Sequence, residues 1–172
     1  MRKVLLGTAA AFLGAMLWVF SQGFGTDPHA VPFLMAGKKA PLFQMKRLDT
    51  DEVVKLESFI GKPIVLNFWA TWCGPCKLEH PVLEWAYQKF GSEVVFLGIV
   101  FEDTEENTKR FIRENGGSFP QLFDPRSTVA VDFAVSGVPE TYFIDRAGVI
   151  RGKVAQPIDP ETMQTRIAEI LR

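Results

Sequence analysis

The chain has 172 residues, and its 19 lysines and arginines against 20 aspartates and glutamates give a formal net charge of −1 at pH 7. That balance offers no basic surface to phosphates and argues against a nucleic-acid-binding protein. Hydrophobic residues make up 47% of the chain, and the part that follows the first few tens of residues is long enough for one domain with its own core.

The N-terminal segment, residues 1–24, has the pattern of a membrane anchor. Arg2 and Lys3 precede an apolar, uncharged run, and no further lysine or arginine occurs before Lys38. This charge distribution predicts a single span with the N-terminus inside the cell and the remainder exported. We expect an uncleaved anchor, with a cleaved signal peptide and a buried helix of a soluble domain as alternatives. Residues 25–36 have the glycine and proline content of a tether.

Residues 37–172 are expected to form one α/β domain, whose sheet is partly parallel and has an antiparallel edge. Strands are predicted at 64–68, 94–101, 120–123, 141–144 and 149–155. Helices are predicted at 73–90, 104–116 and 127–133, with a last helix that Asp159 caps. The apolar residues that recur at helical spacing in the first of these helices are Leu78, Val82, Leu83, Ala86, Tyr87 and Phe90.

The only two cysteines, Cys73 and Cys76, are separated by Gly74 and Pro75 at the start of that helix. A helix N-terminus stabilises a thiolate, so Cys73 is expected to be an exposed nucleophile of lowered pKa. Cys76, one turn deeper, would resolve the mixed disulfide that Cys73 forms. Pro75 suits a first helical turn and adds no donor to the thiolate, which favours the disulfide form and therefore a reductant.

Metal binding is the alternative use of this cysteine pair. A zinc site needs two further ligands, and His29 and His80 are the only histidines that could supply them. Copper(I) suits two thiolates, but histidine or methionine ligands nearby are not evident, so a copper carrier is a second alternative. We expect no metal, cofactor or prosthetic group, because the disulfide is itself the redox centre.

Polar and aromatic residues surround the motif. Glu79 follows Cys76 by three residues and shares its helix face, where a carboxylate could take the proton that Cys76 loses. Spacing alone nevertheless favours a solvated surface glutamate. His80 is expected to be structural or exposed, Trp69 to pack in the core, and Trp72 to face a partner.

The run WCGPCK at 72–77, after NFWA at 67–70, closely resembles the active site of thioredoxins. Pro81 matches the proline that bends the active-site helix in that family, and the run 137–139 matches the loop with the family's cis-proline. The resemblance covers about residues 37–172. It implies the thioredoxin fold, a cis peptide bond before Pro139 and pairing of the Val138 backbone with a bound substrate strand.

Two departures from soluble thioredoxins point to a narrower group. Asn67 stands where thioredoxins carry a buried aspartate, and residues 101–138 hold an extra helix and short strand before the cis-proline loop. Both features resemble the membrane-tethered thioredoxin-like proteins of bacterial cytochrome c maturation, the CcmG/DsbE, ResA and TlpA group. The run 138–145 is especially similar to the CcmG/DsbE branch. In that branch, glutamates at the positions of Glu79 and Glu140 lie near the cysteines and tune them.

The resemblance implies a thiol reductant anchored in the inner membrane, with its catalytic domain on the periplasmic side. Glu79, with Glu140, would help the proton move between the thiols. The implied substrate is the haem-binding Cys-x-x-Cys-His segment of apocytochrome c, or a maturation partner, with electrons from a transmembrane thiol carrier. The Gly74-Pro75 spacer is also compatible with two other functions, a TlpA-like role and a general exported disulfide reductase or isomerase. An oxidase is a further alternative. One domain on one anchor suggests a monomer.

Overall fold

The structure is a computed structural model, and the residues it describes are 7–8, 12–19, 33 and 35–172. The first described segments, 7–8 and 12–19, are helical. Within these described ranges, no helix is both long and apolar enough to span a membrane. The rest of the expected anchor at 1–24, and most of the expected tether, lie outside the described residues.

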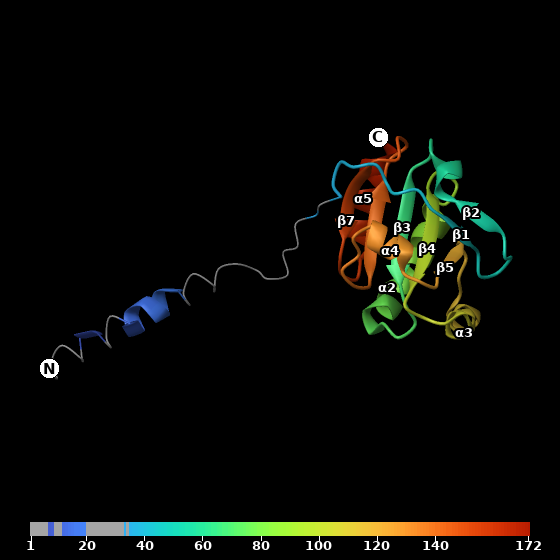
Figure 1. Cartoon of the computed structure of the whole chain (residues 1–172). Helices are drawn as coiled ribbons and strands as arrows, with labels where there is room; N and C mark the ends of the chain where they lie inside the picture. Colours follow the sequence, from blue (N-terminus) through green and yellow to red (C-terminus); the bar gives the residue numbers. More distant parts are fainter. Residues whose placement is uncertain (1–6, 9–11, 20–32, 34) are drawn as a thin grey trace. The chain divides into compact units, whose positions relative to one another are not determined.

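The chain divides into two compact units, Met1–Phe33 and Leu34–Arg172. A five-stranded sheet forms the centre of the second unit, in the order β5-β4-β3-β6-β7 (Figure 1). Its strands are β3 (Ile64–Trp69), β4 (Val95–Phe101), β5 (Gln121–Asp124), β6 (Glu140–Ile144) and β7 (Ile150–Val154). Strands β3, β4 and β5 run parallel to one another, and β6 is antiparallel to both of its neighbours, β3 and β7. Every residue of β3 is buried, as expected for a strand at the centre of a covered sheet.

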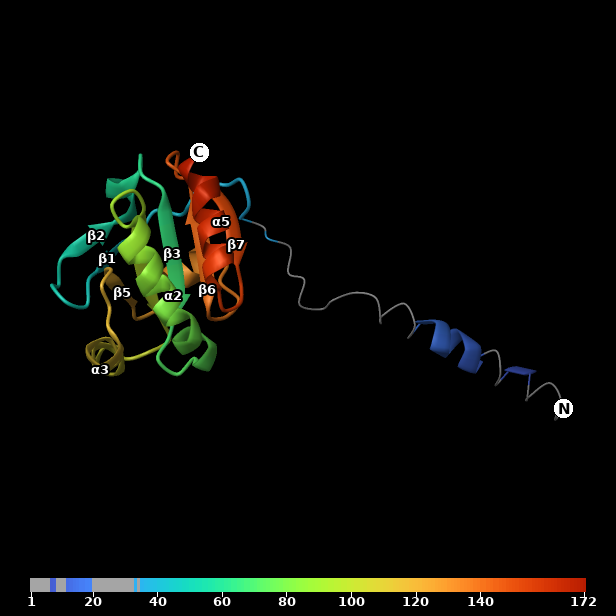
Figure 2. The same cartoon turned by 180° about the vertical axis from the view of Figure 1, so that it is seen from behind.

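Helices α2 (Gly74–Phe90) and α5 (Pro160–Leu171) lie together on one face of this sheet, which Figure 2 views from the front. Their apolar residues form one cluster with the strand residues beneath them, as the helical spacing predicts. The members with an exposed fraction of at most 1% are Val65, Ala86, Val94, Phe143, Met163, Ile167 and Ile170. This layer supports the second half of α2, from Val82 to Phe90, against the sheet.

The other face of the sheet is covered by α4 (Thr128–Asp132) and the residue that follows it, Phe133. The Phe133 ring lies 5.6 Å from that of Phe68 and 5.4 Å from that of Tyr142, between ring centroids. Side chains alternate between the faces of a strand, so neighbouring residues of β3 and β6 reach different layers. This alternation decides which polar residues can meet at the site.

The predicted insertion is confirmed: α3 (Glu105–Asn115), β5 and α4 all stand between β4 and β6. Thr104 caps α3 by accepting a hydrogen bond from the Asn107 N–H at 3.2 Å, and β5 adds a parallel edge strand next to β4. Asp159 caps α5 in the same way, accepting from the Thr162 N–H at 2.9 Å. The domain therefore has the α/β, thioredoxin-like order of elements that the resemblance implies.

Two features depart from the sequence expectations. A small hairpin of β1 (Gln44–Lys46) and β2 (Val53–Lys55), followed by the short helix η1 (Leu56–Phe59), was not predicted because three-residue strands are too short to display a period. Leu78 was expected on the buried face of α2, and its exposed fraction is 75%. The prediction is wrong because the buried face of α2 passes through Cys76 and Glu79 instead.

Candidate active site

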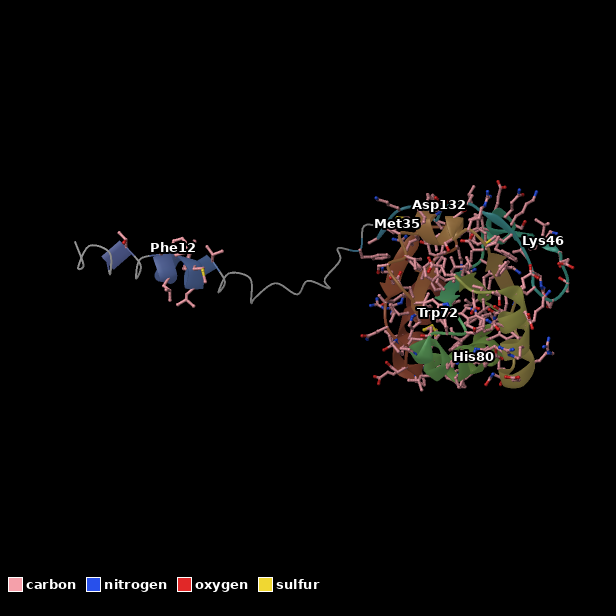
Figure 3. The ribbon with its side chains drawn as sticks, turned by 60° about the horizontal axis from the view of Figure 1, so that its bottom comes forward. Phe12, Met35, Lys46, Trp72, His80 and Asp132 are labelled. Atoms are coloured by element: carbon pink, nitrogen blue, oxygen red, sulfur yellow. A yellow bond between two sulfur atoms is a disulfide. The ribbon has the colours of Figure 1, made fainter. Side chains whose placement is uncertain are left out.

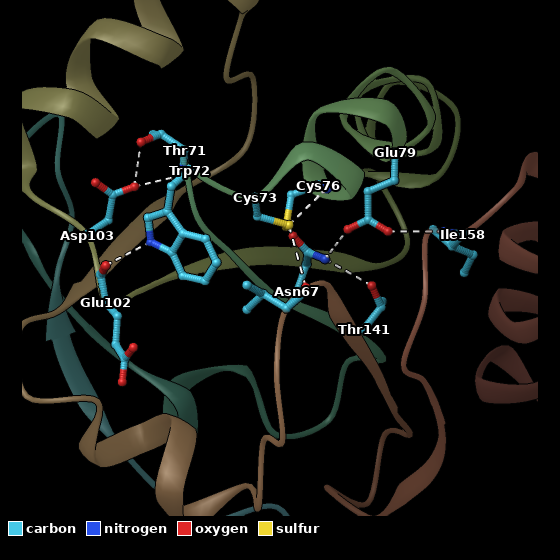
Figure 4. Close-up of a disulfide and its surroundings, with 11 residues drawn as sticks. Asn67, Thr71, Trp72, Cys73, Cys76, Glu79, Glu102, Asp103, Thr141 and Ile158 are labelled. Carbon is cyan, nitrogen blue, oxygen red and sulfur yellow. Dashed lines mark hydrogen bonds between the residues drawn. A yellow bond between two sulfur atoms is a disulfide. The ribbon is translucent and has the colours of Figure 1, made fainter. Parts of the chain in front are cut away.

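The cysteine pair lies where β3 ends and α2 begins. Cys73 is the N-cap of α2, and its Sγ accepts a hydrogen bond from the Cys76 N–H at 3.1 Å. The two sulfurs form a disulfide of 2.05 Å (Figure 4). Pro75 stands in the first turn, where its missing N–H leaves nothing unsatisfied. The helix N-terminus is thus directed at the Cys73 sulfur, and this arrangement stabilises negative charge there.

Cys73 is less accessible than the sequence predicts. Its exposed fraction is 4%, close to the 3% of Cys76, so the expectation of an exposed nucleophile is wrong for this oxidised state. Leu48, Trp69 and Val138 pack around the pair. The peptide bond between Val138 and Pro139 is cis, as the resemblance implies, and the Val138 carbonyl oxygen lies 3.5 Å from Cys73 Sγ. The loop of Val138 and Pro139 therefore lies directly beside the Cys73 sulfur.

The two tryptophans near the site have different environments, as their positions predict. Trp69 is buried, and its Nε1 donates to Oε1 of Gln121 at 2.8 Å. Trp72 has an exposed fraction of 58%, and its Nε1 donates to the Glu102 carbonyl at 2.9 Å. Figure 3 brings forward the end of the domain that carries Trp72 and His80. The exposed Trp72 ring, held by one hydrogen bond, provides an apolar surface beside the cysteines.

Glu79 is buried beneath the start of α2, with an exposed fraction of 1%. Its Oε1 accepts from Nδ2 of Asn67 at 2.8 Å, and its Oε2 accepts from the Ile158 N–H at 3.1 Å. Burial raises the pKa of Glu79 to about 7, although both hydrogen bonds favour the ionised form. The surface position that spacing favours is therefore wrong, and this carboxyl can gain or lose a proton near neutral pH.

Asn67 connects Glu79 to the strands. Its side chain projects from β3 to the α2 face, where Nδ2 also donates to Oγ1 of Thr141 at 3.0 Å. Thr141 stands opposite Asn67 in the pairing of β3 with β6, so the two side chains leave the same face of the sheet. The amide thus replaces the thioredoxin aspartate by a neutral group and provides the link to the buried carboxyl.

Glu140 belongs to a different cluster. It precedes Thr141 on β6, so its side chain leaves the opposite face of the sheet, and its exposed fraction is 2%. Its Oε1 accepts from the N–H and the hydroxyl of Ser136, at 3.1 and 2.7 Å. Its Oε2 accepts from the Tyr142 hydroxyl at 3.0 Å and from Nζ of Lys153 at 3.2 Å. The structure therefore does not bring Glu140 into the network of Asn67 and Glu79.

His80 has a structural environment. Its exposed fraction is 7%, its Nε2 lies 3.1 Å from the Gly116 carbonyl oxygen, and its ring packs against Trp69 and Phe111. His29, the other candidate zinc ligand, lies outside the described residues. Within the part of the chain that the structure describes, no group of three or more histidine, cysteine, aspartate or glutamate side chains is placed to hold a metal.

Sequence reasoning missed Thr141 and the backbone of Ile158, which both belong to the polar network under the cysteines. Thr141 lies 74 residues after Asn67, and Ile158 lies 79 residues after Glu79. Thr141, which follows Pro139-Glu140, could have been found from strand alternation, once β6 was paired with β3. The Ile158 N–H lies before a helix and gives no side-chain signal.

Comparisons with known proteins agree with this geometry. Residues 36–153 match the model of the AhpC/TSA family. The thiol:disulfide interchange protein HelX of Rhodobacter capsulatus is 34% identical over 164 residues, which cover 94% of this chain and 90% of HelX. The thiol:disulfide interchange protein DsbE of Escherichia coli K12 is 32% identical, over 96% of this chain and 92% of DsbE.

Solved structures give the same result. A crystal structure titled as a putative thiol:disulfide interchange protein DsbE from Chlorobium tepidum superposes with a TM-score of 0.74 at 27% identity. The match covers 80% of this chain and 98% of that one. A structure titled as MTB dsbF in mixed oxidised and reduced forms superposes with a TM-score of 0.70 at 30% identity, over 74% of this chain and 94% of that one.

Proposed function

The chain belongs to the AhpC/TSA family and, within it, to the group of thiol:disulfide interchange proteins named DsbE and HelX; from that premise we propose that it is an exported, membrane-anchored thiol reductant of cytochrome c maturation. Its activity is that of a thiol:disulfide oxidoreductase. The proposed substrate is the disulfide of the haem-binding Cys-x-x-Cys-His segment of apocytochrome c, or a maturation partner that carries that disulfide.

The observation that carries the proposal is the cysteine pair at the α2 N-terminus, next to the Val138 carbonyl and above a buried Glu79. A reductant needs a stabilised thiolate, a second thiol and a group that takes the second proton. The N-cap position of Cys73 supports the first role, and the helical turn to Cys76 supports the second. The raised pKa of Glu79, due to burial, supports the third.

The reaction begins with the reduced form of the pair. The Cys73 thiolate attacks one sulfur of the substrate disulfide, and the other substrate sulfur leaves as a thiolate. Cys76 then loses its proton to Glu79, and its sulfur attacks Cys73 Sγ. The bond between Cys73 and the substrate breaks, and the second substrate sulfur leaves. Two electrons pass to the substrate, and the Cys73–Cys76 disulfide remains.

The loop of Val138 and Pro139 is proposed to position the substrate. The Val138 carbonyl lies within 3.5 Å of Cys73 Sγ, where an extended substrate backbone could pair with it as an added strand. On the other side of the loop, Ser136 donates two hydrogen bonds to Glu140. Glu140 is therefore assigned to holding this loop, and Trp72 to apolar contact with the substrate.

The location and the partners rest on the sequence and on the family. The charge pattern of Arg2, Lys3 and the apolar run after them supports a single-pass anchor in the inner membrane, with the catalytic domain on the periplasmic side. Electrons are proposed to come from a transmembrane thiol carrier. The disulfide serves as the redox centre without a further cofactor, and the protein acts as a monomer.

Trapping of the mixed disulfide tests the proposal. In a Cys76→Ser variant expressed in its native host, Cys73 can attack but the mixed disulfide is not resolved. We expect mass spectrometry to find apocytochromes c or maturation proteins on Cys73, and none on a Cys73→Ala/Cys76→Ser control. A wide set of unrelated exported proteins would instead establish a general reductase or isomerase and refute the dedicated role.

A further inference from the structure

The side-chain oxygen of Asn67 is the feature of the site that the mechanism above does not use. Among the described residues, Oδ1 of Asn67 is a buried side-chain atom with no hydrogen-bond partner. The other end of the same amide is fully engaged, with Nδ2 donating to Glu79 and to Thr141. A buried acceptor without a donor costs free energy, so a native protein keeps one where another state or a function uses it.

The direction of the amide indicates which group that is. In Figure 4, the Asn67 amide lies between the disulfide and Glu79, with its nitrogen turned toward Glu79 and Thr141 and its oxygen turned toward the sulfurs. Cys76 stands one helical turn before Glu79 on the buried face of α2. Cys76 has an exposed fraction of 3%, so its side chain is enclosed by the protein.

The oxidation state explains why the oxygen has no partner here. A disulfide sulfur carries no hydrogen and cannot donate, whereas a thiol is a weak donor. Reduction places one hydrogen on the Cys76 sulfur, which makes it a donor on the side toward which the unpartnered Asn67 oxygen is turned (Figure 4). The Cys76 thiol then needs an acceptor and the Asn67 oxygen needs a donor, so one hydrogen bond between them satisfies both groups.

We propose that Asn67 is a positioning residue of the exchange reaction, whose Oδ1 accepts a hydrogen bond from the Cys76 thiol in the reduced protein while its Nδ2 holds the Glu79 carboxylate. The amide then keeps Cys76 protonated while Cys73 attacks, and it fixes Glu79 where the proton must go. This inference rests on the proposed function, because it assigns a role within the same reaction.

The proton and the electrons balance in this scheme. During resolution the S–H bond of Cys76 breaks, and its proton passes to Glu79. The sulfur lone pair forms the bond to Cys73, and the bond from Cys73 to the partner breaks with its electrons on the leaving sulfur. Asn67 gains and loses no proton, and its Oδ1 returns to the state without a partner that the disulfide form has.

Among the described residues, the groups that face this amide and Glu79 come from one helix, two strands and the loop before α5. They are Cys76 from α2, Asn67 from β3, Thr141 from β6 and the Ile158 N–H before α5. None of them carries a fixed charge, and burial is the largest cause of the raised Glu79 pKa. The nearby Lys153 interacts with Glu140 on the other face of the sheet. A neutral amide can therefore orient both groups without itself titrating.

Infrared spectroscopy of the S–H stretch tests the hydrogen bond directly. A full-length Cys73→Ser variant, purified in detergent micelles, holds Cys76 as its only thiol. We expect its S–H band at lower frequency than the band of the same protein unfolded in urea. Adding Asn67→Leu, which has a similar shape and no acceptor, should return the band toward the unfolded position. Adding Thr141→Val should leave the band in place, because it removes a partner of Nδ2 only.

A second measurement needs no substitution, in case Asn67→Leu does not fold. With asparagine carrying ¹³C in the side-chain carbonyl, the wild-type chain gives amide bands from Asn67, Asn107 and Asn115 alone. We expect reduction to lower the frequency of one of them, as a new hydrogen bond to Oδ1 requires. An S–H band at the unfolded position, or no change of the amide bands on reduction, would overturn the inference.

These outcomes are separable from those of the proposed function. Both spectra report a bond within the protein and involve no partner. A missing thiol band shift together with trapped apocytochromes would refute the role of Asn67 and leave the function standing. A shifted band without trapped partners would refute the substrate and leave the positioning role standing.

Discussion

Glu79 and Glu140 come from the same end of the domain and are almost equally buried, with exposed fractions of 1% and 2%, yet they lie on opposite faces of the sheet. Among the described residues, Glu79 accepts only from an asparagine amide and a backbone N–H, and no cation is paired with its charge. Glu140 is paired with Lys153 and also accepts from Ser136 and Tyr142. Because Glu79 is buried among neutral partners, its carboxyl can change its charge near pH 7. Glu140 is buried beside a cation instead, and its hydrogen bonds hold the loop that contains Ser136.

The ion pair of Glu140 should give the largest effect on stability. In Lys153→Met, Glu140 remains buried without its cation, so we expect unfolding in urea to become easier by about 3–5 kcal/mol at pH 7. The matched control is Lys109→Met, which breaks an exposed pair with Glu105 and should cost below about 1 kcal/mol. Equal effects of the two substitutions would show that the buried pair does not hold the loop.

The double variant Glu140→Gln/Lys153→Met sharpens the same test. It removes both charges and keeps one side-chain oxygen that can still accept from Ser136. We expect it to be more stable than Lys153→Met alone, because no charge is left buried and unpaired. A double variant that is less stable than Lys153→Met would contradict this explanation.

The second prediction is the pH dependence that Glu79 gives to folding. Its pKa is about 7 in the folded chain and near 4.5 when the group is free, so between these values the folded state binds more protons than the unfolded state. Protonated Glu79 therefore makes its whole contribution to the stability of the folded state below about pH 4.5, and this contribution is lost as the pH rises through 7. The loss amounts to about 3 kcal/mol at 1.36 kcal/mol per pKa unit.

Unfolding free energies measured from pH 4.5 to 8 check this sign and size. In Glu79→Gln the decline attributed to Glu79 should disappear, and the difference between the two proteins isolates it from other titrating groups. The lowered pKa values of Asp49, Asp103, Asp145 and Asp159 act below this window. A wild-type curve parallel to that of Glu79→Gln across the window would show that Glu79 does not titrate there.

The smallest expected effect concerns the hydroxyl of Tyr142. It donates to the Phe133 carbonyl at 2.8 Å and contacts Glu140, so Tyr142→Phe removes hydrogen bonds and no charge. We expect a loss of about 1 kcal/mol in unfolding free energy, since the ring packing against Phe68 and Phe133 stays. A loss as large as that of Lys153→Met would mean that the hydroxyl, and not the ion pair, dominates this cluster.

The sequence predicts the fold and the reactive pair because both leave local signals. The apolar runs, the cap residues Thr104 and Asp159 and the cysteine spacing each depend on neighbours within a few positions. The resemblance adds what spacing cannot, namely the cis bond before Pro139.

Two adjacent residues of α2 show where local reasoning fails. Apolar periodicity places Leu78 inside and Glu79 outside, but their exposed fractions are 75% and 1%. The helix is rotated so that its polar residue lies over Asn67, a partner 12 residues earlier in the chain. Such exceptions to binary patterning are expected at functional sites, where a buried polar group serves the chemistry. Only the paired strands reveal the partners that make this burial tolerable.

The central claim is that Glu79, on the α2 face, takes the proton of Cys76 during exchange. Its most direct test is a single turnover of the reduced protein with an oxidised Cys-x-x-Cys-His peptide at pH 7, quenched with acid and followed by mass spectrometry. We predict that Glu79→Gln resolves the mixed disulfide about 10²-fold more slowly than wild type, as expected when a general base is lost. Glu84→Gln, from the same helix but bonded to the Ser118 N–H, should resolve it at the wild-type rate. Resolution in Glu79→Gln at the wild-type rate would contradict the account.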